Sequence, residues 1–255
     1  MGSSQPSVYF VLGTPGSGRR DLVRDLIENG LDANERAVVL VAESETASPA
    51  AEKLAARADT EVRRWKWDES ALPPVKLPSD SSVFLLADAY ADPITQLEAL
   101  KPWLAQQGAE LARVFCVVDC QFAEKQPVLK PWYEACIHFS DVVFLTKREG
   151  VANKWISDFL RHYEDECFPS LFIQVKKGGI ANPALVLEPQ PRRVSQYFDE
   201  SEDFTDLVIE TDDDEDQEDE DADDGLPEPE PYFERHRSGR RAKELPDIRE
   251  YLPAK

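Results

Sequence analysis

The stretch VLGTPGSGRRDLVRDL begins with an apolar run, continues through three glycines and ends in a helix-like pattern. Its spacing, Gly13-x4-Gly18, is typical of a loop that binds phosphate groups, because such a loop points backbone N–H groups at an anion beside a helix N-terminus. Apolar residues precede the loop in VYFVL and recur at helical spacing after it in RDLVRDLIENG. The stretch therefore predicts a buried strand, a phosphate-binding turn and a helix, in that order.

Short apolar runs alternate with longer amphipathic stretches over most of the chain. We expect strands at Val8–Leu12, Ala37–Val41, Ser82–Ala87, Arg113–Asp119, Val142–Thr146 and Leu171–Val175. We expect helices at Arg19–Glu28, Ser48–Arg57, Ile94–Gln107, Gln126–Phe139 and Val151–Glu166. Several of these strands are apolar throughout, which is typical of strands covered on both faces of a parallel sheet. The rhythm predicts an α/β fold, with a doubly wound and mainly parallel sheet over residues 8–190, after a flexible N-terminus at 1–7.

The acidic residues are concentrated toward the C-terminal end. The net charge is −21, and the stretch from Asp199 to Pro231 contains 19 acidic residues and no Lys or Arg. The rest of the chain is therefore nearly neutral. A run such as DDDEDQEDEDADD has too little apolar surface to fold, and PEPEP is typical of a stiff, extended spacer. We expect residues 191–231 to be a disordered acidic and proline-rich linker; a second interpretation is that its carboxylates bind divalent cations loosely.

Residues 232–255 form a third region, which is basic and aromatic. It contains the basic run RHRSGRRAK and apolar side chains such as Tyr232, Phe233 and Ile248. Two interpretations stay open: the segment is the intramolecular counterpart of the acidic tail, tethered to it by the flexible spacer, or it docks on an unknown protein partner. The sequence argues against nucleic acid as the partner, because the basic footprint is small and the α/β domain is not basic.

Cysteine usage and hydropathy indicate the cellular compartment. The four cysteines, Cys116, Cys120, Cys136 and Cys167, form no CxxC pair, which is typical of reduced thiols in an intracellular protein. No apolar run approaches the about 18 residues of a membrane span, and the first residues do not resemble a secretory signal. We therefore expect a cytoplasmic protein without a membrane segment.

Two positions of the glycine loop depart from the residues that nucleotide hydrolysis needs. A working loop places Lys after its last glycine, to reach the phosphates, and then Ser or Thr, to bind Mg²⁺. This chain has Arg19 and Arg20 there, while Thr14 and Ser17 carry hydroxyls at the wrong offset. Arg19 retains a positive charge, but Arg20 offers Mg²⁺ no oxygen. We predict an anion site without efficient hydrolysis. Its residues are Gly13, Thr14, Gly16, Ser17, Gly18, Arg19 and Arg20.

The loop is the first of four segments that share an order with one family. The others are ADAYADP (Ala87–Pro93), VFCVVDCQF (Val114–Phe122) and SDVVFLTKREGV (Ser140–Val151). Together they resemble the CobW family, which belongs to the CobW/HypB/UreG group of P-loop GTPases and includes metallochaperones. The resemblance implies a sheet of the P-loop NTPase type and GTP or GDP as the nucleotide. The chain departs from the family in several motifs, and the acidic stretch stands where the family's usual C-terminal domain would follow.

The segment ADAYADP resembles the family's switch segment E-T-x-G-x-A-D-P. In register, Leu86 takes the place of the family's Glu and Ala89 that of its Gly. The carboxylate that would support Mg²⁺ and position water is therefore missing from its slot. Asp88 and Asp92 remain as switch-like carboxylates, and two interpretations of Asp88 stay open: a partial substitute for that Glu, or a polar residue that ends a strand.

The segment TKRE resembles the family's base-reading motif NKxD. The resemblance implies that Lys147 packs its stem over the base and that Glu149 accepts hydrogen bonds from guanine. Glu149 is one methylene longer than the family's Asp, and Thr146 replaces a bridging amide. A lost or misplaced polar contact of this kind costs about 1–3 kcal/mol. We therefore expect a weakened preference for guanine.

The family's metal-binding Cys-x-Cys-Cys is absent. VAESETAS (Val41–Ser48) follows the second strand and contains no cysteine. Cys116 and Cys120 bracket a strand end and are typical of core thiols, and the three histidines, His138, His162 and His236, show no ligand spacing. We find no zinc motif, and the replaced loop residues argue against Mg²⁺.

Three functional hypotheses follow from these departures. The first is a CobW-like nucleotide-binding protein with weak or absent hydrolysis and an interaction or regulatory role. The second is an active GTPase or metallochaperone of the CobW group. The third is a structural adaptor that binds no nucleotide because arginine side chains fill its loop. Whether the chain is an enzyme stays open at this point, and no catalytic residue is assigned.

Overall fold

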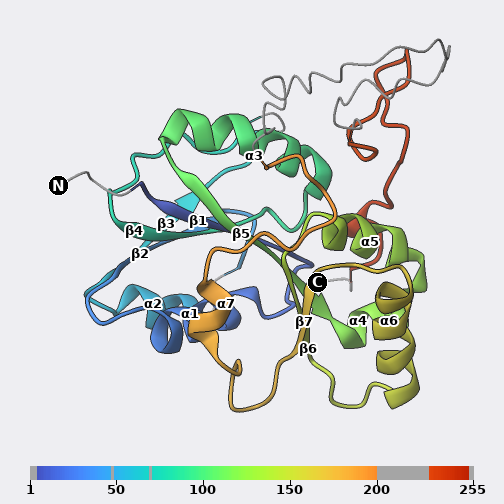
Figure 1. Cartoon of the computed structure of the whole chain (residues 1–255), viewed down its shortest axis with the longest axis horizontal. Coiled ribbons are helices and arrows are strands. Elements are labelled where there is room, and N and C mark those ends of the chain that lie inside the picture. Colours follow the sequence, from blue (N-terminus) through green and yellow to red (C-terminus); the bar gives the residue numbers. More distant parts are fainter. Residues whose placement is uncertain (1–4, 47–48, 69–70, 200–229, 253–255) are drawn as a thin grey trace, which may run out of the picture.

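The computed structural model describes residues 5–46, 49–68, 71–199 and 230–252 (Figure 1). The strands are β1 Ser7–Gly13, β2 Arg36–Ala42, β3 Thr60–Trp65, β4 Ser81–Leu86, β5 Glu110–Asp119, β6 Val142–Thr146 and β7 Leu171–Gln174. The helices are α1 Arg19–Gly30, α2 Pro49–Ala55, α3 Pro93–Gln107, α4 Cys120–Lys125, α5 Lys130–His138, α6 Asn153–Asp165 and α7 Pro183–Leu187. The acidic run within 200–229 lies outside the described residues, as do residues 1–4 of the expected N-terminus.

The seven strands form one sheet in the order β3-β2-β4-β1-β5-β6-β7, and every strand pairing is parallel. The predicted α/β class and doubly wound sheet are confirmed. Strand β1 lies between β4 and β5, so that the chain extends the sheet on both sides of it. The loop after β1 therefore opens at the place where the strand order reverses, which is where sheets of this kind bind ligands.

Helices cover both faces of the sheet. Alternate side chains of β1 point to opposite faces: Val8, Phe10 and Leu12 pack with the helices α3 to α6, whereas Tyr9 and Val11 pack with α1, α2 and α7. In Figure 1 the helices α1, α2 and α7 lie together on one side of the sheet and α3 lies on the other. Because both faces are buried, the central strands are apolar at every position instead of alternating.

The apolar pattern did not predict β3, α4 or α7, and one predicted helix begins later in the structure. The strand β3 was not predicted, because TEVRRW is mostly charged; the strand pairs only with β2 at the edge of the sheet, where polar side chains reach solvent. The helix expected over Gln126–Phe139 begins at Lys130 instead. A short 3₁₀ turn, Pro127–Leu129, comes before it, and Pro131 lies in the first turn of α5. Proline is tolerated only at the start of a helix, so the two prolines divide the stretch.

The C-terminal segment, which we define as residues 230–252, packs against α3 and α5. Arg241 and Arg235 both bind the Glu98 carboxylate, with Nη2–Oε2 distances of 2.5 and 2.7 Å. The rings of Phe233 and Phe139 stack with centroids 5.3 Å apart. Ile248 is buried in the same core as α3 and α5. These contacts place the segment beside the loop that follows β4.

The cysteines of the described chain are all free thiols. Cys116, Cys120 and Cys136 are buried, and Cys167 is exposed. Burial raises the pKa of Cys120 to about 12, so its thiol stays protonated. Cys116 and Cys120 are therefore core residues, as their positions at a strand end predicted. Among the described residues, none of the helices combines the length and the apolar character needed to cross a bilayer.

Candidate functional site

The glycine loop joins β1 to α1, as predicted. Gly13, Gly16 and Gly18 have φ values of 145°, 76° and 93°. A Cβ atom on Gly13 would lie 2.7 Å from the carbonyl oxygen of Val117, so any other residue would clash with the neighbouring strand. Gly16 and Gly18 have open space around them and are needed for their left-handed backbone alone. The loop therefore has the backbone path that the motif predicts.

The Arg19 side chain turns into the protein and away from the mouth of the loop. It is 3% exposed. Its Nη1 donates to the carbonyl oxygen of Ala87 at 2.7 Å and to that of Val11 at 3.3 Å, at the ends of β4 and β1. Its Nη2 donates to the Glu45 carboxylate. Every contact of this guanidinium is therefore with the chain itself.

Glu45 holds both arginines of the loop. Its side chain is 6% exposed, and its Oε2 lies 3.5 Å from Nη2 of Arg20 while its Oε1 binds Arg19. Arg20 also donates to the carbonyl oxygen of Thr46. We call Arg19, Arg20 and Glu45 the arginine corner. Its carboxylate comes from the stretch after β2 and its guanidiniums from the start of α1, so folding brings the three together.

The arginine corner lies against the glycine loop and lines a small cavity with residues 16–18 of the loop. Burial lowers the pKa of Arg19, and the Glu45 carboxylate opposes that shift. The cavity that remains beside these side chains measures about 80 Å³. This volume is far below the range of about 300–1,000 Å³ typical of ligand sites. The donor set does not fit Mg²⁺ either, because two guanidiniums already occupy the nearby carboxylate.

Both hydroxyl residues of the loop are buried, although Ser17 also borders the cavity beside the arginine corner. Thr14 and Ser17 are fully buried, and neither hydroxyl oxygen has a hydrogen-bond partner in the described chain. The Tyr133 hydroxyl, from α5, is buried in the same way. Burial raises the pKa of Tyr133 well above its usual value, and the Thr14 hydroxyl acts in the opposite direction. These groups are therefore part of the packing beneath the loop, at the wrong offset for a metal ligand.

The switch-like carboxylates organise the turn between β4 and α3. Asp88 accepts from the Ser44 hydroxyl at 2.7 Å and from the backbone N–H of Tyr90 at 2.9 Å. Asp92 caps α3: it accepts from the N–H of Ile94 at 2.9 Å and from the Thr95 hydroxyl at 2.9 Å. Both residues thus have local structural partners, and both also line a separate cavity described below.

The three base-reading positions separate in the structure. The Thr146 hydroxyl lies 2.8 Å from the carbonyl oxygen of Ser17, which joins the end of β6 to the glycine loop. Lys147 donates through Nζ to Asp119 at 2.8 Å, and Asp119 in turn caps α4. Glu149 is exposed and does not line the cavity that Thr146 and Lys147 line. Thr146 and Lys147 therefore stay near the loop, and Glu149 does not join them.

A cavity of about 480 Å³ opens on the other side of the loop. It lies between the start of α1, the pair Thr146–Lys147 and the turn Val175–Ile180 that follows β7. We call it the side cavity. Gly179 has φ 96° and approaches Asp25 so closely that a Cβ atom would lie 2.6 Å from its carboxylate. That carboxylate accepts from the N–H of Ile180 at 2.6 Å, which fixes the wall of the cavity to α1.

Sequence reasoning missed two acidic residues of the site. Glu45 comes three residues after the end of β2, in VAESE, and Asp119 is the last residue of β5, in VVDC. A carboxylate at the carboxyl end of a parallel strand was the available signal, but the partner of each was distant in sequence. Among the residues that the structure describes, no group of three or more His, Cys, Asp or Glu side chains is arranged to hold a metal ion.

Solved structures with a similar fold include two forms of one GTPase and a second protein. A zinc-bound triple mutant of the YjiA GTPase is 14% identical, covers 74% of this chain and 67% of its own, and gives a TM-score of 0.41. Zinc-bound YjiA from E. coli has the same identity and coverage and a TM-score of 0.37. The cell division protein FtsY from Thermotoga maritima is 18% identical, covers 75% of this chain and 67% of its own, and gives 0.44.

The likeness concerns the fold alone. The strand order and the glycine loop themselves agree with the P-loop type of sheet that the motifs predicted. No family model and no curated protein matches this chain.

Proposed function

We propose that this chain is a P-loop-fold protein that acts by binding a protein partner and does not hydrolyse nucleotide with Mg²⁺. One observation carries the proposal: the Arg19 guanidinium is buried and bound by the Ala87 and Val11 carbonyls and by Glu45. The side chain that would face phosphates instead closes the loop. A loop stabilised in this way keeps its fold without a nucleotide.

The pattern of departures supports the same proposal. Arg19, Arg20, Leu86 and the TKRE variant all fall on slots for phosphate, metal, water or base. The strands and helices around those slots are intact, and the core is continuous on both faces of the sheet. The residues in the slots for phosphate, metal, water and base are therefore replaced, whereas the sheet and helices, which can present a surface to a partner, are complete.

The proposal is tested by measuring phosphate release from GTP and from ATP with the full chain. The assay is run without metal, with MgCl₂ and with ZnCl₂, beside Arg19→Ala and a matched control, Arg161→Ala, on the exposed face of α6. We expect release at the rate of the protein-free blank in every condition. Magnesium-dependent turnover that persists in the control and disappears in Arg19→Ala would contradict the proposal.

A second candidate function is nucleotide binding without Mg²⁺, and the side cavity favours it. At about 480 Å³ it lies within the usual range for small-molecule sites, and Lys147 lines it. Its test is the thermal shift with guanosine, GDP and GTP in the absence of metal. A ligand present at 100 times its dissociation constant stabilises the fold by about 2.7 kcal/mol. No shift at millimolar nucleotide eliminates this candidate and leaves the first.

A further inference from the structure

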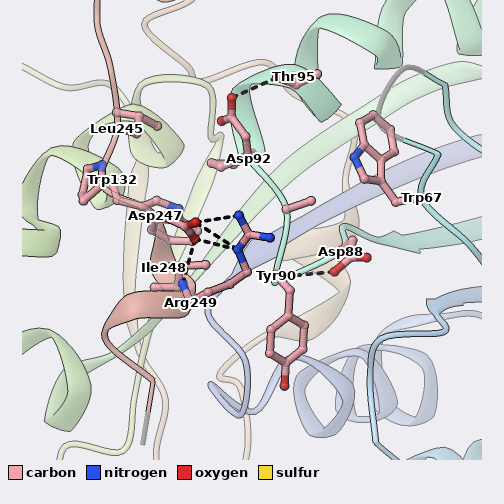
Figure 2. Close-up of a pocket in the computed structure, with 13 residues that line it drawn as sticks. Trp67, Asp88, Tyr90, Asp92, Thr95, Trp132, Leu245, Asp247, Ile248 and Arg249 are labelled. Carbon is pink, nitrogen blue, oxygen red and sulfur yellow. Dashed lines mark hydrogen bonds and ion pairs between the residues drawn. The ribbon is translucent and has the colours of Figure 1, made fainter.

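A second open cavity lies between the turn that joins β4 to α3 and the C-terminal segment (Figure 2). Its volume is about 530 Å³, within the range of about 300–1,000 Å³ typical of ligand sites. Four separate parts of the chain form its walls: Trp67 after β3, residues 88–93 after β4, Trp132 in α5 and residues 245–249 of the C-terminal segment. A cavity with walls from such distant parts exists only when the C-terminal segment is docked.

Two carboxylates of this cavity are held by neutral donors. Asp88 accepts from the Ser44 hydroxyl and Asp92 from the Thr95 hydroxyl, in addition to backbone N–H groups. The cation recorded beside Asp92 is Arg241, whose Nε lies 3.8 Å from Oδ2, beyond hydrogen-bonding distance. The wall after β4 is therefore acidic, and positive charges near its carboxylates include those of buried Arg19, near Asp88, and of Arg241, near Asp92.

Aromatic side chains line the same space. Trp67 and Trp132 belong to opposite sides of the close-up, and Tyr90 extends from the turn that carries Asp88 (Figure 2). Trp67 is partly exposed, so part of its indole is accessible from the cavity. Indole and phenol rings attract cations through the negative faces of their π systems, and guanidinium groups also stack on them. Carboxylates and aromatic rings together form a set that suits an organic cation.

The chain already places one guanidinium at this cavity. Arg249 binds the Asp247 carboxylate through Nε and Nη2, at 2.9 and 2.6 Å, and Figure 2 shows this pair drawn between Trp132 and Trp67. The Arg249 side chain is 67% exposed and is itself part of the lining of the cavity. The surroundings therefore accommodate a planar cation. Asp247 already binds one, the guanidinium of Arg249.

We propose that this cavity binds the side chain of an arginine presented by a basic segment of a partner protein. The guanidinium lies against Trp67 and Tyr90 and pairs with Asp88 and Asp92. The net charge of −21 favours the approach of a basic partner over long distances and disfavours anionic ligands. This inference names a partner chemistry and does not depend on whether the side cavity binds nucleotide.

The first experiment uses a small arginine probe and its neutral analogue. N-acetyl-arginine methylamide and N-acetyl-citrulline methylamide have nearly the same shape and differ in charge. Both are titrated into the full ¹⁵N-labelled chain, whose five tryptophans give resolvable indole N–H signals, two of them from Trp67 and Trp132. We expect saturable shifts of those two signals with the arginine probe, and an affinity at least tenfold lower with citrulline. Equal affinity for both probes, or no saturation by 20 mM arginine probe (roughly the weak limit of a specific contact), would overturn the proposal.

Variants then separate the site from its surroundings. The double variant Asp88→Asn with Asp92→Asn is expected to weaken the arginine probe at least tenfold. Arg249→Gln is expected to tighten it severalfold, because the variant frees Asp247. Asp158→Asn, on the exposed face of α6, is the matched control and should leave the affinity unchanged.

The double variant and Arg249→Gln are expected to change the affinity for the arginine probe in opposite directions, which excludes misfolding as the common explanation. A double variant that fails to fold loses binding for a trivial reason, but a tightened site in Arg249→Gln cannot arise from loss of structure. Unchanged binding in both the double variant and Arg249→Gln would overturn the proposal. High salt should weaken the arginine probe and leave the citrulline probe unaffected, because only the charged probe is screened.

Discussion

The arginine corner and the side cavity lie on two sides of one glycine loop and have opposite characters. In the corner, Arg19 and Glu45 bind one another and the space that remains is about 80 Å³. In the side cavity, about 480 Å³ stays open between α1 and the turn after β7. The same loop therefore borders a small space at the arginine corner and leaves the region beside Lys147 accessible.

Whether a glycine loop can bind an anion therefore depends on the contacts of the side chains beside it as well as on its backbone. Gly13, Gly16 and Gly18 have the conformations that the motif needs, whichever side chains follow. The Arg19 guanidinium is buried, and burial of an unpaired charge is costly, so it needs the Glu45 carboxylate and two carbonyl oxygens. Once those partners are in place, moving the guanidinium toward an external phosphate would leave Glu45 buried without its main partner.

The largest expected effect comes from removing the carboxylate of the arginine corner. Glu45→Gln leaves the buried Arg19 charge without its ion pair, and breaking a buried pair costs about 3–5 kcal/mol. We expect the free energy of unfolding, measured by urea denaturation, to fall by that amount. Glu43→Gln, two residues away and exposed, should change it by less than about 0.5 kcal/mol. Equal effects of the two variants would show that the corner is not a buried, coupled unit.

Glycine substitutions compare the tight and the open parts of the loop backbone. Gly13→Ala places a Cβ atom 2.7 Å from the Val117 oxygen at φ 145°, whereas Gly16→Ala meets nothing within 4 Å at φ 76°. The clash and the strained backbone at Gly13 should cost about 2–4 kcal/mol, against about 1–2 kcal/mol for the left-handed backbone at Gly16. Urea denaturation of the two variants measures the difference. A Gly16→Ala variant less stable than Gly13→Ala would contradict the described packing.

A smaller effect is expected where the two regions meet. The Thr146 hydroxyl lies 2.8 Å from the Ser17 oxygen and 3.0 Å from the Val118 oxygen, and it can donate to only one of them at a time. Thr146→Val keeps the shape and removes that hydrogen bond from a buried position, which should cost about 1–2 kcal/mol. Amide hydrogen exchange should also accelerate in the glycine loop. Unchanged exchange there would indicate that β6 does not restrain the loop.

The smallest effect is expected at the edge of the side cavity. Lys147 is 44% exposed and pairs with Asp119 at 2.8 Å, so Lys147→Met should lower the free energy of unfolding by less than about 1 kcal/mol. Thermal denaturation of the variant at low and high salt measures this contribution. Salt should reduce the difference between variant and wild type, because an exposed pair is screened. A loss of unfolding free energy as large as that of Glu45→Gln would show that the Lys147 pair is coupled to the fold as strongly as the arginine corner.

The fold was largely predictable because buried parallel strands are apolar throughout. The strands near Val8–Leu12 and Val142–Thr146 were found from that pattern to within one residue, and the missed β3 is a charged edge strand. The site was less predictable. Thr146 and Lys147 lie near the loop as the motif suggested, whereas Glu149 points to solvent, because its place depends on the turn after β6 and on no local pattern.

The parallel sheet and the glycine loop at its centre can be predicted from the amino-acid sequence, because apolar runs and glycine spacing are local properties of the chain. The sequence also determines that the loop lacks a hydroxyl for Mg²⁺, because that depends on the identity of Arg20 alone. The position of the Arg19 guanidinium, in contrast, depends on long-range contacts that form only in the folded chain. Its partners, Glu45 and the Ala87 carbonyl, are 26 and 68 residues away along the chain, and a long flexible side chain is oriented by whatever folding brings within its reach.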